Sequence, residues 1–87
     1  MKFTKDPGST LDYTVDWTTW LGTDTIASVV WTVPTDLTQT NATNTTLLAT
    51  VWLSGGTVGA TYKIVCQITT AAGRIEERYF FIEMVDK

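Results

Sequence analysis

The sequence predicts an all-β protein with an immunoglobulin-like β-sandwich of six to seven antiparallel strands; a small β-barrel is the second choice. β-Branched and aromatic residues dominate every periodic segment, and runs of Ala, Leu, Glu and Lys at helical spacing are missing. Turn signals recur at intervals of about ten residues, which is typical of the short strands of a sandwich. We therefore expect a single domain over residues 1–87, with residues 1–10 as an extended N-terminal arm.

The first two strands are expected on either side of a turn at residues 21–24. In residues 11–17 apolar side chains alternate with polar ones, which predicts a strand with one buried and one solvated face. Residues 25–33 alternate in the same way before Pro34 interrupts the ladder. The side chains expected to face inward are Leu11, Tyr13, Val15 and Trp17 in the first strand and Ala27, Val29, Trp31 and Val33 in the second.

The middle of the chain is expected to contain a short strand, a polar connection and a longer strand. The short strand is placed near residues 37–40, and the Asn- and Thr-rich residues that follow are expected to form a connection rich in turns. From residue 46 to residue 54 the odd positions are apolar, and the even positions after Leu48 are largely polar. This alternation leaves the side chain of Trp52 facing outward.

Residues 61–70 and 75–85 are expected to pair as the last and longest hairpin. Both inward sets fall on even positions, and residues directly opposite one another in an antiparallel pair share a face. The loop must therefore contain an odd number of residues. Residues 71–73 fit a three-residue loop with Gly73 in the left-handed conformation, and a five-residue loop satisfies the same parity. The inward sets are Tyr62, Ile64, Cys66 and Ile68, and Phe80, Ile82 and Met84.

The glycine-rich stretch VWLSGGTVGATY, residues 51–62, has two readings. A phosphate-binding loop needs a following helix whose N-terminal amides face the anion, together with a lysine that reaches the phosphate. Here an alternating strand follows instead, and Lys63 comes too late. We therefore interpret the stretch as a corner between two sheets, in which the Tyr62 hydroxyl binds a backbone group a few residues upstream.

Composition argues against most kinds of active site. The chain has no His and one Cys, which excludes hydrolase sites with a His base, zinc sites that contain His, and an internal disulfide. Paired carboxylates are available at Asp12 with Asp16 and at Glu76 with Glu77 or Glu83, but all are expected on solvated faces, where burial cannot shift their pKa values. The sequence assigns no catalytic, cofactor-binding or metal-ligating residue.

Charge and hydropathy argue against nucleic acid and membrane partners. The net charge is −3, and no basic cluster provides an electrostatic footprint for nucleic acid. No apolar run approaches the ~20 residues that cross a bilayer, and the first ten residues lack the apolar segment of a signal peptide. Anionic partners are therefore disfavoured.

The candidate partner-binding residues are Trp52, Val65, Tyr79 and Phe81. The last three are expected on one outward file of the final hairpin, and exposed Trp and Tyr are over-represented among interface anchors. The alternative is that a neighbouring strand, a loop or the N-terminal segment covers each of them.

Two longer stretches resemble a known family: LDYTVDWTTWLGTDTIASVVWTVP, residues 11–34, and ATVWLSGGTVGATYKIVCQITTAAGR, residues 49–74. Over roughly residues 6–78 the chain resembles short structural proteins of tailed bacteriophages, some of them fiber-tail adaptors, and the most specific pieces are DYTVDW, WTVP and TVWLSGG. The resemblance implies an immunoglobulin-like sandwich built into the virion, with no enzymatic activity and with tail, neck or fibre proteins as partners. The aromatic and acidic end, YFFIEMVDK, departs from the family pattern, so the resemblance does not identify the partner.

Two functions follow as hypotheses. The first is a non-enzymatic assembly module, made in the host bacterial cytoplasm and present in multiple copies in a symmetric virion assembly. The second is a carbohydrate-binding or adhesive sandwich that stacks sugars on exposed Trp residues. An assembly module should co-purify with particles in fixed copy number, whereas a carbohydrate module should bind glycans as a free monomer.

Overall fold

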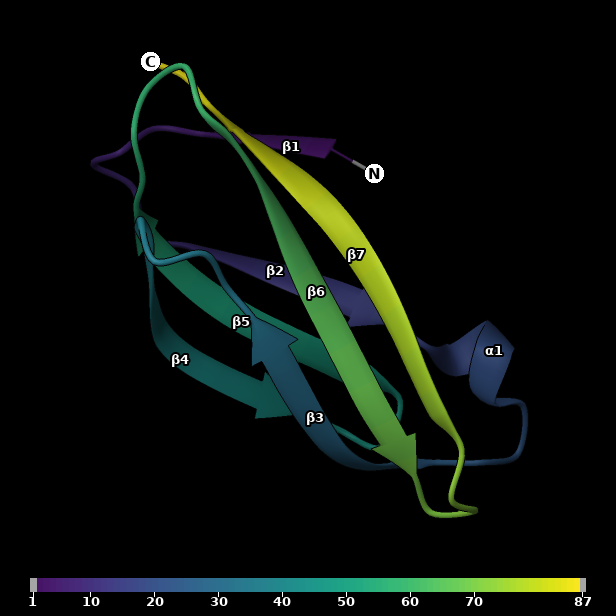
Figure 1. Cartoon of the computed structure of the whole chain (residues 1–87). Coiled ribbons are helices and arrows are strands. Elements are labelled where there is room, and N and C mark those ends of the chain that lie inside the picture. Colours follow the sequence, from purple (N-terminus) through teal and green to yellow (C-terminus); the bar gives the residue numbers. More distant parts are fainter. Residues whose placement is uncertain (1, 87) are drawn as a thin grey trace.

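The structure, a computed structural model, describes residues 2–86 and contains seven strands in two sheets (Figure 1). Sheet I has the strand order β1-β7-β6-β3 and sheet II the order β2-β5-β4, so the strands form a sandwich and not a closed barrel. The sets β3-β6-β7 and β2-β5-β4 correspond to the C-F-G and B-E-D strands of immunoglobulin domains. The elements are β1 (Lys2–Lys5), β2 (Leu11–Asp16), α1 (Thr18–Leu21), β3 (Ile26–Thr32), β4 (Leu37–Asn44), β5 (Leu48–Gly55), β6 (Thr61–Thr70) and β7 (Ile75–Met84).

The N-terminal segment, expected as an arm, includes a strand of sheet I. Residues 2–5 form β1, which pairs in parallel with β7, whereas antiparallel strands alone were expected. Phe3 and Lys5 face the interior, and four residues with a lysine at an inward position give no readable alternation. Met1 and Lys87, the outermost residues of the expected domain, lie outside the described residues.

Lys5 is buried, and its ammonium donates to the carbonyl oxygens of Asp6 and Gly55 at 3.0 and 2.8 Å. Burial lowers the pKa of Lys5, and the nearby charge of Asp6 acts in the opposite direction. The lysine therefore ties β1 to the end of β5 through backbone carbonyls.

Two expectations for the middle of the chain were wrong. In β3 a bulge between Ile26 and Ser28 reverses the parity, so Ile26 is buried and Ala27 is exposed. The connection expected after residue 40 is instead part of β4, an edge strand whose residues after Leu37 are all exposed. A strand with no buried face shows no alternation, which is why its sequence resembled a loop. The short helix α1 was also not anticipated.

The final hairpin confirms the predicted register. Tyr62 lies opposite Ile82 and Ile64 opposite Phe80, and Thr70 donates its N–H to the Arg74 carbonyl oxygen, which leaves a three-residue loop. Gly73 in that loop has a φ of +91°. The inward sets of both strands are buried, as expected.

The corner between β5 and β6 is also as predicted. The Tyr62 hydroxyl accepts the N–H of Thr57 at 3.0 Å and donates to the Asp36 carboxylate at 3.0 Å. Gly56 has a φ of +103°, and a Cβ atom there would lie 2.6 Å from the Met84 side chain. Glycine is thus required where the chain crosses from sheet II to sheet I over the core.

Candidate partner-binding surfaces

Three of the predicted residues meet on the outer surface of sheet I. Val65 lies directly opposite Tyr79 in the β6-β7 pair, and Phe81 follows two residues later on the same side of β7. The rings of Tyr79 and Phe81 are 5.5 Å apart between centroids and nearly perpendicular, at 74°. Tyr79 is 56% exposed, and the other two are half-buried. We call Val65, Tyr79 and Phe81 the aromatic face.

Charged side chains of both signs border the aromatic face. The Lys63 ammonium lies 4.5 Å from the centre of the Tyr79 ring, within the range of a cation–π contact. Lys2 pairs with Glu83 at 3.0 Å, and both side chains are largely exposed, so this pair contributes at most about 1 kcal/mol to stability. The surface is therefore an apolar centre with a polar rim, as in many protein interfaces.

The fourth predicted residue, Trp52, lies on the opposite side of the sandwich. It is 37% exposed on the outer surface of sheet II, between Asp12 on β2 and Asn41 on β4 in cross-strand register. Its outward orientation is confirmed. The structure does not bring it together with the aromatic face, so the chain presents two separate candidate surfaces.

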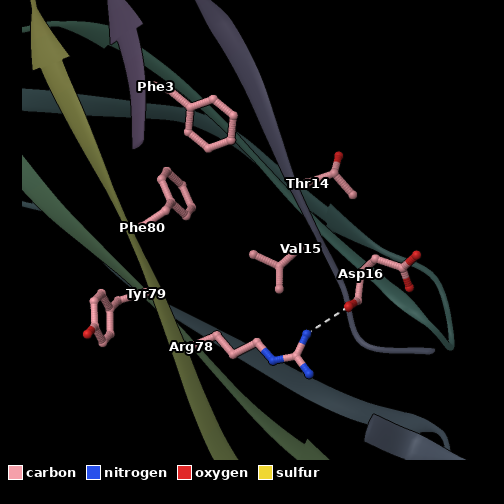
Figure 2. A pocket seen from close by; sticks show the side chains of 7 residues that line it. All are labelled: Phe3, Thr14, Val15, Asp16, Arg78, Tyr79 and Phe80. Atoms are coloured by element: carbon pink, nitrogen blue, oxygen red, sulfur yellow. Dashed lines mark hydrogen bonds between the residues drawn. The ribbon is translucent and has the colours of Figure 1, made fainter. Parts of the chain in front are cut away.

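A pocket that the sequence did not predict opens between the edges of the two sheets. Phe3, Val15 and Phe80 point into it from β1, β2 and β7, whereas the Tyr79 side chain points away (Figure 2). Arg78 crosses its base, where a guanidinium N–H donates to the Asp16 carbonyl oxygen at 2.9 Å. The pocket has a volume of about 220 Å³; its full lining is Phe3, Thr14, Val15, Asp16, Arg78, Tyr79 and Phe80.

One sequence signal marked this pocket. Arg78 occupies an even position of β7, on the same inward file as Phe80. Glu76 lies on the same file, so two charged side chains precede Phe80 on the inward side of β7, which is unusual. They indicate a place where the sandwich is open to solvent at its side.

Two arginines stack on tryptophans at the α1 end of the sandwich. The guanidinium of Arg78 lies 4.5 Å from the Trp17 ring centre, and that of Arg74 lies 4.3 Å from Trp20. The two indoles are 5.5 Å apart and close to perpendicular, at 72°. Asp24 pairs with Arg74 at 3.1 Å. These contacts fix the position of α1 against sheet I.

The pKa of Asp24 is lowered to about 2, because its carboxylate accepts a hydrogen bond from the Thr70 hydroxyl and further bonds from the Thr25 N–H, Arg74 and the Ala72 N–H. The pKa of Asp16 is also lowered, chiefly by the Thr18 hydroxyl. Such groups remain ionised at neutral pH and are poor proton donors. They serve to order loops at the surface.

Cys66 is buried in the core, and its burial raises the pKa of the thiol to about 11. A thiol with this pKa is almost fully protonated at neutral pH and therefore a weak nucleophile. Within residues 2–86 no three side chains of the metal-ligating types gather in one place. None of the helical residues that the structure describes belongs to a segment long and apolar enough to cross a bilayer.

Comparison with known families gives a match over most of the chain. The sequence profile described as podophage GP4 fiber-tail adaptor protein gp77 matches residues 5–83. This range covers almost all of the sandwich, from the last residue of β1 to the penultimate residue of β7. Among curated proteins no match is found.

Proposed function

Because the chain belongs to the podophage fiber-tail adaptor family, we propose that it is a non-enzymatic virion module that joins tail or neck proteins to fibre proteins. In this role it is made in the host cytoplasm and occupies several equivalent positions in a symmetric assembly. The buried Cys66 thiol, whose pKa is raised to about 11, is a weak nucleophile at neutral pH, which supports a role without catalysis.

The partner is proposed to bind at the aromatic face. A tyrosine that is 56% exposed beside Phe81 and Val65 leaves apolar surface in contact with water on the outer side of sheet I. Tyr and other large side chains in the centre of an interface contribute most of the binding energy, while a charged rim excludes water from it. Lys63 and Glu83 lie at that rim.

Two substitutions test this role in a phage that lacks the gene and receives it from a plasmid. Phe81→Ser should leave the isolated domain folded and reduce the amount of the chain in purified particles. Ile75→Ser is the matched control, because Ile75 is also on β7 and is 64% exposed at the hairpin end. Normal incorporation of Phe81→Ser would refute the aromatic face as an interface, and loss of folding would show that Phe81 is a core residue.

Trp52 is the candidate for a second protein interface or for a carbohydrate-binding surface. It is exposed between Asp12 and Asn41, and an indole beside carboxylate and amide groups is a surface on which a sugar ring can stack. Trp52→Ala should impair assembly if sheet II is a second interface of the adaptor. Binding of the free monomer to a glycan array, lost in Trp52→Ala, would support the carbohydrate-binding alternative instead.

A further inference from the structure

We propose that two copies of the chain pair through the open edge of sheet I, with β3 of one copy antiparallel to β3 of the other about a two-fold axis at Val30. The pairing joins the two copies of sheet I into one continuous sheet, through a contact that is the same surface on both copies. It uses neither the aromatic face nor Trp52, and it does not depend on the adaptor role.

β3 has a neighbouring strand on one side only, because it is the last strand of sheet I (Figure 1). The described chain begins in β1 and ends just after β7, and both strands are separated from β3 by β6. At the start of β3 the Ile26 N–H binds the Thr46 carbonyl oxygen at 2.9 Å. Within residues 2–86 no other backbone group from a turn or loop binds β3, so residues 28–32 form the open part of its edge.

The hydrogen bonds of β6 show which backbone groups of β3 point to this edge. Thr70 donates its N–H toward β7. Because backbone groups alternate in direction along a strand, those of the odd residues of β6 bind β3. These odd residues lie opposite the even residues of β3 after the bulge, as Gln67 does opposite Val30. The N–H and C=O groups of Val29 and Trp31 therefore point away from β6, to the open edge.

The sequence around this edge carries almost no charge. Between Asp24 and Lys63 the only charged residue is Asp36, and β3 contains neither a charged residue nor a proline. Edge strands usually carry charges, Lys above all, or Pro, which prevent pairing with another chain. β3 lacks this protection, and its uncharged surface can meet a second copy without repulsion although each chain has a net charge of −3.

β4, which lies at an edge of sheet II, differs from β3 in this respect. A bulge interrupts its register between Gln39 and Asn41. The side-chain oxygen of Asn41 accepts the Ala42 N–H at 2.9 Å. Bulges and local capping bonds of this kind oppose the addition of a further strand. The edge that is available for pairing is therefore that of β3.

Antiparallel pairing of β3 with its own copy is self-complementary when it is centred on Val30. Val29 then lies opposite Trp31 of the second copy, and these are the residues whose backbone groups point to the edge. Val30 lies opposite Val30 of the second copy as a non-hydrogen-bonded pair, in which the two side chains are closest. Val30 is 57% exposed in the single chain, and Val29 and Trp31 are half-buried. Pairing therefore buries apolar surface on both sides of the sheet.

Analytical ultracentrifugation of the purified chain measures this pairing. A strand edge buries little surface, so we expect a weak dimer that forms between about 10 µM and about 1 mM. Val30→Lys places like charges opposite one another and should weaken the dimer at least about tenfold, equivalent to ~1.4 kcal/mol. Val58→Lys is the matched control, because Val58 is 52% exposed between β5 and β6 and the charge change is the same. This control should dimerise like the unaltered chain.

A mixing experiment tests the two-fold register. Val30→Glu alone should also be monomeric, because two carboxylates then lie opposite one another. An equal mixture of Val30→Lys and Val30→Glu should dimerise, since opposite charges meet at the axis. A mixture that stays monomeric would overturn the register centred on Val30.

Other results would overturn the pairing as a whole. These are an unaltered chain that stays monomeric up to about 1 mM, one that forms larger oligomers, or a Val30→Lys chain that dimerises normally, and all three leave the adaptor role intact. A monomeric chain whose Val30→Lys variant is lost from particles would assign the edge to a different virion protein. Absence of the unaltered chain from particles would overturn the adaptor role alone.

Hydrogen exchange decides if the Val30 variants fail to fold. In the unaltered chain the Val29 and Trp31 amides should exchange rapidly at low concentration and slowly at high concentration. Exchange at these two amides that is independent of concentration would overturn the pairing.

Discussion

Replacing Tyr62 with Phe should destabilise the domain by about 2 kcal/mol. The substitution keeps the buried ring and removes one oxygen, which accepts the Thr57 N–H and donates to the Asp36 carboxylate, each at 3.0 Å. A neutral hydrogen bond contributes about 0.5–1.5 kcal/mol to stability, and one to a charged group about 1.5–3 kcal/mol. Asp36 is exposed, so water replaces part of the hydrogen bond that its carboxylate loses. The expected loss of stability from the two bonds together is therefore near the lower end of the summed range.

Thermal and urea unfolding measure this loss. In a domain of this size each 1 kcal/mol lowers the melting temperature by roughly 4–8 °C, so Tyr62→Phe should melt roughly 8–16 °C lower. Tyr79→Phe is the control, because it removes the same atom from an exposed ring on β7. A Tyr62→Phe domain that unfolds within about 0.5 kcal/mol of the unaltered one would refute the corner as a source of stability.

Two further perturbations give expected outcomes of different kinds. Gly56→Ala should lower the free energy of unfolding in urea by more than about 1 kcal/mol, because φ is +103° and the new Cβ would lie 2.6 Å from Met84. Gly22→Ala is the control and should lower it less, because φ is +63° and the space around the new Cβ is open. Equal losses in the two variants would contradict the steric reason. The pKa of Asp24 is about 2 when folded, below its ordinary 3.8, so its stabilisation is complete above pH 4 and lost as the pH falls toward 2. In Asp24→Asn the midpoint of urea unfolding should therefore change less between pH 4 and pH 2 than in the unaltered chain. Parallel pH profiles of the two proteins would show that Asp24 is not the cause of the pH dependence.

The alternation of apolar and polar residues predicted those strands in which one face is buried and the other is exposed. β5, β6 and β7 each have a more buried file and a more exposed file, so parity gave both the hairpin loop and the outward direction of Trp52. In β2 Tyr13 is buried and Val15 half-buried as expected, whereas Leu11, also expected to face inward, is 37% exposed. The alternation could not reveal β4, which has no buried face, or the bulge at Ile26, which reverses the pattern of inward and outward residues. β1 was missed because the burial of its inward lysine depends on a hydrogen bond to the Gly55 carbonyl, 50 residues away, in addition to the one to the adjacent Asp6 carbonyl.

The same reasoning limited what could be predicted of the binding surfaces. The exposure of Tyr79 follows from its position on β7, and its contact with Val65 follows from the register of one hairpin. The pocket depends on how the edges of two sheets lie, and Val15 and Phe80 come from strands that never pair. In the sequence, the charged residues Glu76 and Arg78 at even positions of β7 indicate that this side is open.

A density map of the intact phage particle at side-chain resolution would show what covers sheet I. We expect the chain in a fixed number of copies at the junction of tail and fibre, with Tyr79 and Phe81 beneath a neighbouring protein. A map in which the chain is present and its aromatic face is open to solvent in every copy would contradict this role for the face.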